Sequence, residues 1–439
     1  MGFNSLQETK LKLDRGLARN TLWVSVGQGT RLAIQAAYFT LIARSLGVKN
    51  YGEFVGVVAA IGIFYPFGAL GRGNILVQNV SRDRSLFASM WGTALFTTVS
   101  CGSVLVGLAV LISAMALPAA IPLRLILLVA ASDIVGLNII LISGQAFQAF
   151  DKLNWMATIN VLISASRLIG ALILVGLQRH PSALQWGYVY FWSTAGVAAV
   201  AYCLVSMKLG YPELAFPRSV AELREGLYFS LGFSAQTIYN DIDKTMLARL
   251  STLVATGIYG AAYRIVDVSF SPVSSLLYAA YPSFFRAGAG GIAASCKYAK
   301  PLLIRSLGFS FLICTAILLF AGVVPRILGA QYAATAEALR WLSFLPILKS
   351  VHYFLSDVLT SAGHQAVRTV IQIGVALFNI LINLWIIPAY SWRGAAVSSL
   401  ASDALLACSV GVAVSILLRR SQTESALRGV VMEETGSAT

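Results

Sequence analysis

Long apolar runs recur from one end of this chain to the other, and they restrict the folds that it can adopt. One of them is "LFTTVSCGSVLVGLAVLISAMAL", residues 95–117. An apolar run of about 18 or more residues is long enough to cross a bilayer as a helix. Of the 439 residues, 57% are hydrophobic and 11% are charged, whereas soluble domains average roughly 45–50% and 25%. The sequence therefore predicts an all-α, polytopic membrane protein.

The apolar runs divide into about twelve predicted transmembrane helices. Their approximate ranges are 20–43, 52–71, 87–112, 122–146, 155–177, 186–207, 226–248, 254–281, 302–323, 337–360, 367–388 and 393–418. The second range contains Pro66, Gly68 and Gly71, which predict a bend or close helix packing. An even number of helices places both termini on one side of the membrane. Most of the 32 Lys and Arg residues lie in segments on that side, which predicts that both termini are cytoplasmic.

The net charge of +14 does not indicate a nucleic-acid partner. Basic residues retained on the cytoplasmic side of membrane helices produce this balance by themselves, and no basic run alternates with aromatic residues. The five cysteines and three histidines are scattered, without the spacing of a metal site. The sequence predicts no metal, no cofactor and no catalytic residues, because no nucleophile and base stand in a recognisable arrangement.

An internal repeat links the first and seventh predicted helices. The segment "NTLWVSVGQGTRLAIQAAYFTLIAR", 20–44, aligns without a gap with "EGLYFSLGFSAQTIYNDIDKTMLAR", 225–249, and both end on an arginine. Six helices separate the copies, so the repeat is parallel and predicts two lobes related by an axis along the membrane normal. The predicted parts are an N-terminal six-helix lobe at 1–207, a cytoplasmic linker at 208–225, a C-terminal six-helix lobe at 226–418 and a cytoplasmic polar tail at 419–439.

Polar and charged residues fall at helical spacing inside several predicted spans. The stripes are Gln28, Arg31 and Gln35; Asn160, Ser164 and Arg167; Gln236, Asn240, Asp243 and Lys244; Arg264, Asp267 and Ser271; Lys349, Tyr353, Ser356 and Asp357; and Gln372, Asn379 and Asn383, with Asp133 and Asp403 as single acids. A charge in the bilayer costs several kcal/mol unless it faces water or a partner. The stripes predict a hydrophilic chamber between the lobes. The alternative is pairing between neighbours, such as Arg264 with Asp267 or Lys244 with Asp241.

The charges inside the spans have mixed signs, which suggests two kinds of ligand. Arginine suits phosphate or carboxylate, and a buried aspartate can carry a proton or hold a cation. The predicted substrate-binding residues are Gln28, Arg31, Gln35, Asn160, Arg167, Asn240, Lys244 and Arg264. The predicted ion-coupling residues are Asp133, Asp243, Asp267 and Asp357.

Three segments resemble bacterial polysaccharide flippases. They are "RNTLWVSVGQGTRLAIQAAYFTLIARSLGVKNYGEFVGVVAAI" near the start, "DIDKTMLARLSTLVATGIYGAAYRIVD" in the seventh and eighth spans, and "RGAAVSSLASDALL" in the last span. The resemblance extends over nearly the whole chain. It places the chain with the multidrug, oligosaccharidyl-lipid and polysaccharide exporter superfamily, and it implies two six-helix lobes that work by alternating access.

The resemblance also implies a substrate and a location. The substrate would be an undecaprenyl-pyrophosphate-linked oligosaccharide repeat unit, moved from the cytoplasmic to the periplasmic leaflet of the bacterial inner membrane for lipopolysaccharide or exopolysaccharide synthesis. The partners would be this lipid-linked glycan, the bilayer, a polysaccharide polymerase and other assembly proteins. A partly cationic lumen is implied as well, for which the candidates are Arg31, Arg167, Lys244 and Arg264.

Three other functions are compatible with parts of the pattern. An ion-coupled drug or cation exporter of the same fold would share the repeat and the buried acids. A membrane polysaccharide polymerase or ligase would need catalytic groups in substantial external loops, and the predicted external loops are short. A scaffolding protein would use the polar stripes for pairing alone.

Overall fold

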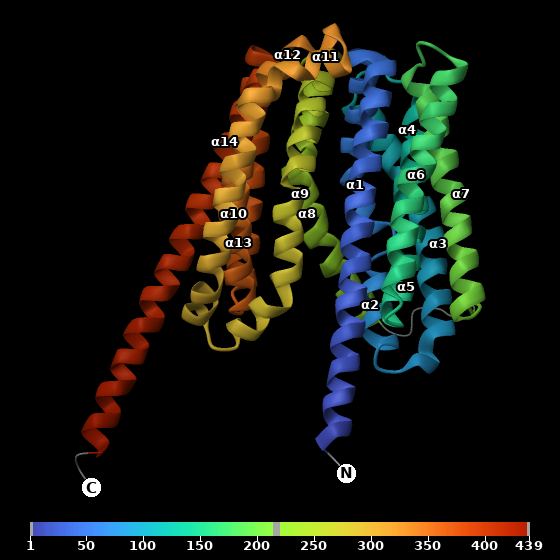
Figure 1. Ribbon diagram of the computed structural model, residues 1–439. Helices are drawn as coiled ribbons and strands as arrows, with labels where there is room; N and C mark the ends of the chain where they lie inside the picture. The colour runs from blue at the N-terminus through green and yellow to red at the C-terminus, as the bar shows by residue number, and fades with distance from the viewer. Residues whose placement is uncertain (1–2, 214–219, 437–439) are drawn as a thin grey trace. The chain divides into compact units, whose positions relative to one another are not determined.

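The computed structural model describes residues 3–213 and 220–436. This part of the chain is helical and contains no β-strand, which confirms the predicted all-α class (Figure 1). Six of its helices are long and apolar enough to cross a membrane, or seven if one bent pair counts as a span. The chain divides into two compact units, Met1–Asp241 and Ile242–Thr439. The twelve-helix count and the lobe boundaries stay predictions.

The first unit is built from helices that pack lengthwise, with α1 against α6 and α6 against α7 (Figure 1). Its elements are α1 (Phe3–Gly62), η1 (Tyr65–Phe67), α2 (Arg72–Val80), η2 (Arg84–Leu86), α3 (Phe87–Ala116), α4 (Leu123–Ala130), the π-helix η3 (Ala131–Leu137), α5 (Asn138–Ala149), α6 (Leu153–Leu177), α7 (Ala183–Leu209) and most of α8 (Val220–Leu250). Its core contains large aromatic side chains from α3 and α5, such as Trp91 and Phe147, both fully buried.

The second predicted span, 52–71, is not one helix. α1 ends at Gly62, and the chain continues through η1 and a turn in which Leu70 and Gly71 have positive φ before α2 begins. The break exposes backbone carbonyls that must be bonded inside a bilayer. Ser234 Oγ donates to the Ile63 carbonyl at 2.9 Å, and Asn138 Nδ2 donates to the Tyr65 carbonyl at 2.9 Å. The bend predicted from the glycines and proline is therefore confirmed, with side chains bonding two of its carbonyls.

A π-helical turn interrupts the span from Leu123 to Ala149. Its backbone lies against the break in the preceding span, since a Cβ added to Gly68 would lie 2.3 Å from the Ile134 carbonyl oxygen. Only glycine allows this approach. The π-turn carries Asp133, which is 5% exposed. π-Helical turns are rare and frequent at functional sites.

The second unit contains the C-terminal end of α8 and the elements that follow it. These are α9 (Leu253–Gly288), α10 (Ile292–Phe320), η4 (Ala321–Val323), α11 (Val324–Leu328), η5 (Ala330–Tyr332), α12 (Ala333–Leu342), α13 (Leu345–Ser361) and α14 (Gln365–Gly436). α13 packs between α10 and α14. Hydroxyl pairs join α10 to α13, with Ser310 Oγ 2.8 Å from Ser350 Oγ.

α14 contains two helices that meet at Ser391, whose φ is 54°. Its apolar part, Gln365–Thr423, has 59 residues, which is about 88 Å of helix and enough for two crossings. The chain folds back at this point, because a Cβ added to Gly394 would lie 2.6 Å from the Ile386 carbonyl oxygen. Asn379 Nδ2 donates to Ser402 Oγ at 3.0 Å and ties the two halves together.

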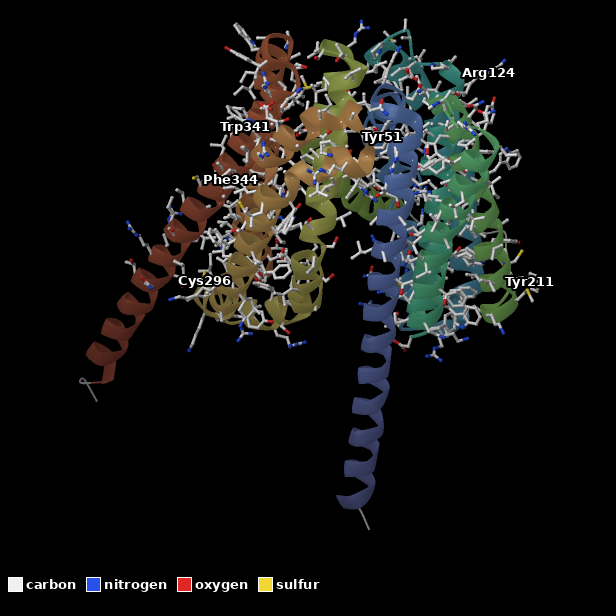
Figure 2. All side chains as sticks on the ribbon, turned by 45° about the horizontal axis from the view of Figure 1, so that its top comes forward. Tyr51, Arg124, Tyr211, Cys296, Trp341 and Phe344 are labelled. Carbon is white, nitrogen blue, oxygen red and sulfur yellow. The ribbon has the colours of Figure 1, made fainter. Side chains whose placement is uncertain are left out.

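The predicted span 337–360 is broken as well. α12 and α13 meet at an angle of 43°, and Trp341 and Phe344 beside the bend are 44% and 49% exposed (Figure 2). Glu337 of α12 forms an exposed, two-bond ion pair with Arg393, at 3.0 and 3.1 Å.

Candidate functional site

A buried polar cluster lies in the first unit around the π-turn. Tyr190 of α7 donates its hydroxyl hydrogen to Asp133 Oδ1 at 2.8 Å. Tyr190 is 6% exposed, and the ring of Phe54 packs edge-on against it at 5.2 Å. The π-turn therefore places the Asp133 carboxylate beside a buried tyrosine of α7.

Arg167 of α6 belongs to the same cluster. The carbon centre of its guanidinium lies 4.0 Å above the Tyr190 ring, and its Nη2 donates to Thr194 Oγ1 at 3.4 Å. Tyr38 of α1 also interacts with the guanidinium. The predicted substrate-binding Arg167 and the predicted ion-coupling Asp133 are thus brought together through one tyrosine. A cation over an aromatic face contributes about 2 kcal/mol when both are desolvated.

The other predicted residues of the first unit lie on α1, α6 and α8. Arg31, Gln35, Asn160 and Asn240 are half-buried. α1 and α6 pack against each other, so the Arg31 and Asn160 stripes lie on neighbouring helices. Gln28 lies outside the residues whose side chains the structure describes.

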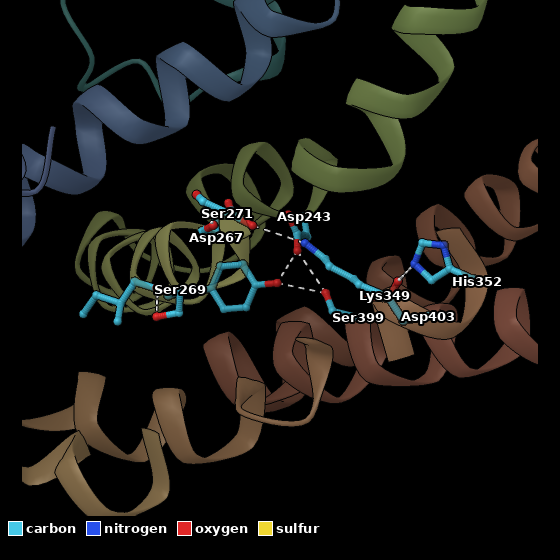
Figure 3. Close-up of polar contacts among 10 residues, drawn as sticks. Asp243, Asp267, Ser269, Ser271, Lys349, His352, Ser399 and Asp403 are labelled. Carbon is cyan, nitrogen blue, oxygen red and sulfur yellow. Dashed lines mark hydrogen bonds and ion pairs between the residues drawn. The ribbon is translucent and has the colours of Figure 1, made fainter. Parts of the chain in front are cut away.

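The second unit contains a buried carboxylate with two hydroxyl donors (Figure 3). Asp243 of α8 is 3% exposed. It accepts a hydrogen bond from Tyr259 of α9 and another from Ser399 of α14 at 3.0 Å. The hydroxyls of Tyr259 and Ser399 lie 2.8 Å apart, so one aspartate links three helices.

Two lysines approach the same aromatic ring beside this carboxylate. Lys244 Nζ lies 4.0 Å and Lys349 Nζ 4.7 Å from the centre of the Tyr263 ring. Lys349 also pairs with Asp267 Oδ1 at 3.2 Å, and the two side chains are 4% and 42% exposed (Figure 3). The cluster therefore extends from the buried Asp243 to a carboxylate that reaches the surface of the unit. Arg264, on the helix that carries Tyr263, is half-buried.

Asp357, another predicted ion-coupling residue, lies apart from that cluster. Its Oδ1 is 3.5 Å from Arg368 Nη1, which also donates to Thr360 Oγ1 at 2.8 Å. The partner, Arg368, lies in the first turn of α14. Spacing along one helix could not identify this pair, because the two residues come from different helices.

Sequence reasoning also missed an ion pair between α13 and α14. His352 Nε2 lies 2.9 Å from Asp403 Oδ1 (Figure 3). The sequence showed Asp403 as a single acid and His352 as one of three scattered histidines. Their side chains are only 1% and 3% exposed, so the contact lies inside the unit.

The sequence profile described as polysaccharide biosynthesis protein matches residues 17–287. The chain belongs to this family. The match covers α1 to α9 almost completely and includes both polar clusters except for the residues contributed by α13 and α14. No curated protein matches the chain.

Solved transporters and flippases share the fold. An inward-facing MATE family multidrug resistance transporter of the MOP superfamily is 15% identical, with a TM-score of 0.69 over 90% of this chain and 99% of that one. The lipid II flippase MurJ in an inward closed conformation is 11% identical, with a TM-score of 0.69 over 90% and 87%. A MOP superfamily transporter from Pyrococcus furiosus is 14% identical, with a TM-score of 0.61 over 92% and 96%. The chain is therefore a multi-pass membrane protein with this transporter fold.

Proposed function

We propose that the protein moves polyprenyl-pyrophosphate-linked oligosaccharide repeat units from the cytoplasmic to the periplasmic leaflet for surface polysaccharide synthesis. The observation that carries this proposal is the family match over residues 17–287. A polysaccharide pathway that crosses a membrane needs a carrier for its lipid-linked intermediates. The fold supports the same role, because it is shared with a lipid II flippase.

The mechanism is alternating access, without covalent chemistry. The pyrophosphate and sugars contact polar side chains while the polyprenyl tail stays in lipid. The proposed contacts are Gln28, Arg31, Gln35, Asn160, Arg167, Asn240, Lys244 and Arg264. Asp133, Asp243, Asp267 and Asp357 are the proposed ion-coupling groups. Guanidinium groups suit a pyrophosphate because they donate two parallel hydrogen bonds to its oxygens.

The proposed location is the bacterial inner membrane, with both termini in the cytoplasm and with polymerase and assembly proteins as partners. The distribution of Lys and Arg supports this orientation. Arg124 at the beginning of α4 and Tyr211 after α7 lie at opposite ends of the first unit (Figure 2), as required if one is periplasmic and the other cytoplasmic.

The test combines a deletion strain with purified protein. Loss of the gene should remove the surface polysaccharide, and proteoliposomes should carry a polyprenyl-diphosphate-linked glycan from one leaflet to the other, measured by its accessibility to an external glycosidase. Arg31→Gln should lower the rate at least about tenfold, because a charge-assisted hydrogen bond contributes about 1.5–3 kcal/mol. Arg124→Gln, the same change at an exposed position, is the control and should have no effect. Normal polysaccharide in the deletion strain would refute the proposal.

A second candidate function is export of drugs or cations. It is favoured by the fold shared with a multidrug transporter over 99% of that chain and by the buried acids of the second unit. Efflux of cationic dyes that follows an ion gradient, together with unchanged polysaccharide after deletion, would establish this function instead.

A further inference from the structure

His352 and Asp403 form a buried pair that the proposed substrate contacts do not use. The histidine lies on α13 and the aspartate on the second half of α14 (Figure 3). Their atoms approach to 2.9 Å, and both side chains are almost fully buried. The two residues therefore hold a titratable group inside the second unit, at a contact between two helices.

Histidine is the side chain whose ordinary pKa falls between pH 5 and 8. The pair can exist as imidazole with carboxylate, with a net charge of −1, or as imidazolium with carboxylate, with a net charge of zero. Asp403 Oδ1 lies 2.9 Å from Nε2, so the carboxylate is close enough to stabilise a proton on the ring. Binding of one proton from water, which adds to the imidazole ring, thus changes the charge between α13 and α14 by one unit.

The ligand chemistry favours a proton over a metal cation. Hard cations such as Na⁺ prefer shells of oxygen ligands, as Ca²⁺ and Mg²⁺ do. An imidazole that occupies one side of the carboxylate removes part of such a shell. The imidazole provides instead a basic nitrogen, which can bind a proton.

Two acid–base pairs lie between α13 and the helices packed around it. From α9, Asp267 pairs with Lys349, which also contacts the Tyr263 ring. From α14, Arg368 pairs with Asp357. From α10, the facing groups are the Ser310 hydroxyl and the Cys314 thiol. Next to His352 on α13 itself, the Tyr353 ring lies 4.4 Å away.

The two flanking pairs, Lys349 with Asp267 and Arg368 with Asp357, each join a carboxylate to a lysine or an arginine. The contact between His352 and Asp403 differs from them, because its base is an imidazole, the side chain whose ordinary pKa falls in the physiological range. Adding or removing one buried charge changes the electrostatic free energy by several kcal/mol. This is at least as large as the few kcal/mol that separate two conformations of a carrier.

We infer that the His352–Asp403 pair is a proton-binding site through which the carrier is coupled to a proton gradient. The inference rests on the proposed function for its transport role, whereas proton binding itself does not depend on it. Proton loading neutralises the contact and stabilises one packing of α13 on α14. Proton release to the other side of the membrane restores the charge and favours a different packing.

The first experiment measures proton binding directly. The variant H180Q/H364Q leaves His352 as the single histidine and does not alter the pair. In lipid nanodiscs with ¹⁵N-labelled histidine, the ring signals should report uptake of one proton between about pH 5 and 8. Asp403→Asn should move the midpoint by one pH unit or more, since it removes the charge that stabilises the imidazolium. An imidazole that does not titrate between pH 4 and 9, or a midpoint unchanged by Asp403→Asn, overturns the inference.

The second experiment measures coupling. Proteoliposomes with and without an imposed pH gradient are tested with a polyprenyl diphosphate that carries one N-acetylhexosamine. In the unaltered protein the gradient should accelerate transfer severalfold, and in His352→Gln the ratio of the two rates should fall to one. His364→Gln, at the turn between α13 and α14, is the matched control and should keep the ratio. A gradient response that persists in His352→Gln overturns the inference. If the unaltered protein transfers no glycan, the proposed function fails, and the titration still decides the proton site.

Discussion

Each unit of the protein contains a buried aspartate that accepts a hydrogen bond from a tyrosine, and beside it a cation over a tyrosine ring. In the first unit the pair is Asp133 with Tyr190, and in the second it is Asp243 with Tyr259. The distance from the cation to the aromatic ring is 4.0 Å in both. The two units therefore bury polar groups by the same chemistry.

The internal repeat nevertheless relates the clusters at one position only, and the residues there differ, since Tyr38 interacts with Arg167 in the first cluster. The alignment of 20–44 with 225–249 places Asp243 opposite Tyr38 and Lys244 opposite Phe39. Phe39 is buried against Tyr51, with ring centres 5.9 Å apart. One repeat copy thus has an aromatic contact where the other has a carboxylate and an ammonium group. The comparison teaches that similarity between two sequence segments does not assign equivalent roles to their aligned positions.

The surroundings of the two carboxylates differ as well. Asp133 sits in a π-turn, and its link to Arg167 passes through a single tyrosine. Asp243 has a second hydroxyl donor from Ser399, and the neighbouring Lys349 has Asp267, which reaches the surface of the unit. The first cluster should therefore depend more strongly on its aspartate and its tyrosine than the second.

The largest expected effect is the loss of charge from the aspartates. Asp133→Asn should lower the free energy of unfolding by about 3 kcal/mol, the upper end for a hydrogen bond to a charged group, because it removes the carboxylate that accepts from Tyr190 and lies near the half-buried Arg167. Asp243→Asn should cost about half as much, since Asp267 remains paired with Lys349. SDS titration of the purified protein in mixed micelles gives both values. Equal losses would show that the two clusters are equally dependent on their acids.

Removal of one tyrosine hydroxyl should have a smaller effect with the same asymmetry. Tyr190→Phe keeps the ring under Arg167 but removes the hydrogen bond to Asp133, at a cost of about 1.5–3 kcal/mol for a bond to a charged group. Tyr259→Phe leaves Asp243 its bond from Ser399, so the loss should be about 1 kcal/mol. The same SDS titration applies. A larger loss for Tyr259→Phe would reverse the comparison.

The sequence predicted the membrane class, most of the helices and the bend near Pro66, because apolar runs, glycine and proline act over short distances along the chain. It did not predict the π-turn, since "ASDIVGL" contains no residue type that requires this backbone. The broken span at 337–360 was missed for a similar reason. α12 and α13 are both apolar, and only their packing sets the 43° angle.

The candidate site was predicted as a set of residues, without its pairs. Spacing along a helix identified Arg167, Asp243 and Lys349 as polar positions inside spans. It could not show that Arg167 shares a tyrosine with Asp133, or that His352 meets Asp403, because these contacts join helices that are distant in the sequence. Alignment within the repeat did not help either, since the one aligned position has Tyr38 in the first cluster and Asp243 in the second.

The smallest expected effect comes from the hydroxyls at the edge of each cluster, and it is the sharpest test of the asymmetry. Thr194→Val keeps the shape of the side chain and removes two hydrogen bonds, the 3.4 Å bond from Arg167 and a 2.8 Å bond to the Tyr190 carbonyl. Because the first bond is long and the second is made within one helix, the loss should be about 0.5 kcal/mol. Ser399→Ala removes a 3.0 Å bond to the Asp243 carboxylate and should cost about 1 kcal/mol, because Tyr259 still donates to the same oxygen. Here the order is reversed, with the second unit losing more. If Thr194→Val lowers the free energy of unfolding more than Ser399→Ala does, the Thr194 hydroxyl stabilises the first cluster more than its 3.4 Å distance from Arg167 predicts. The order expected for the two hydroxyls would then be wrong.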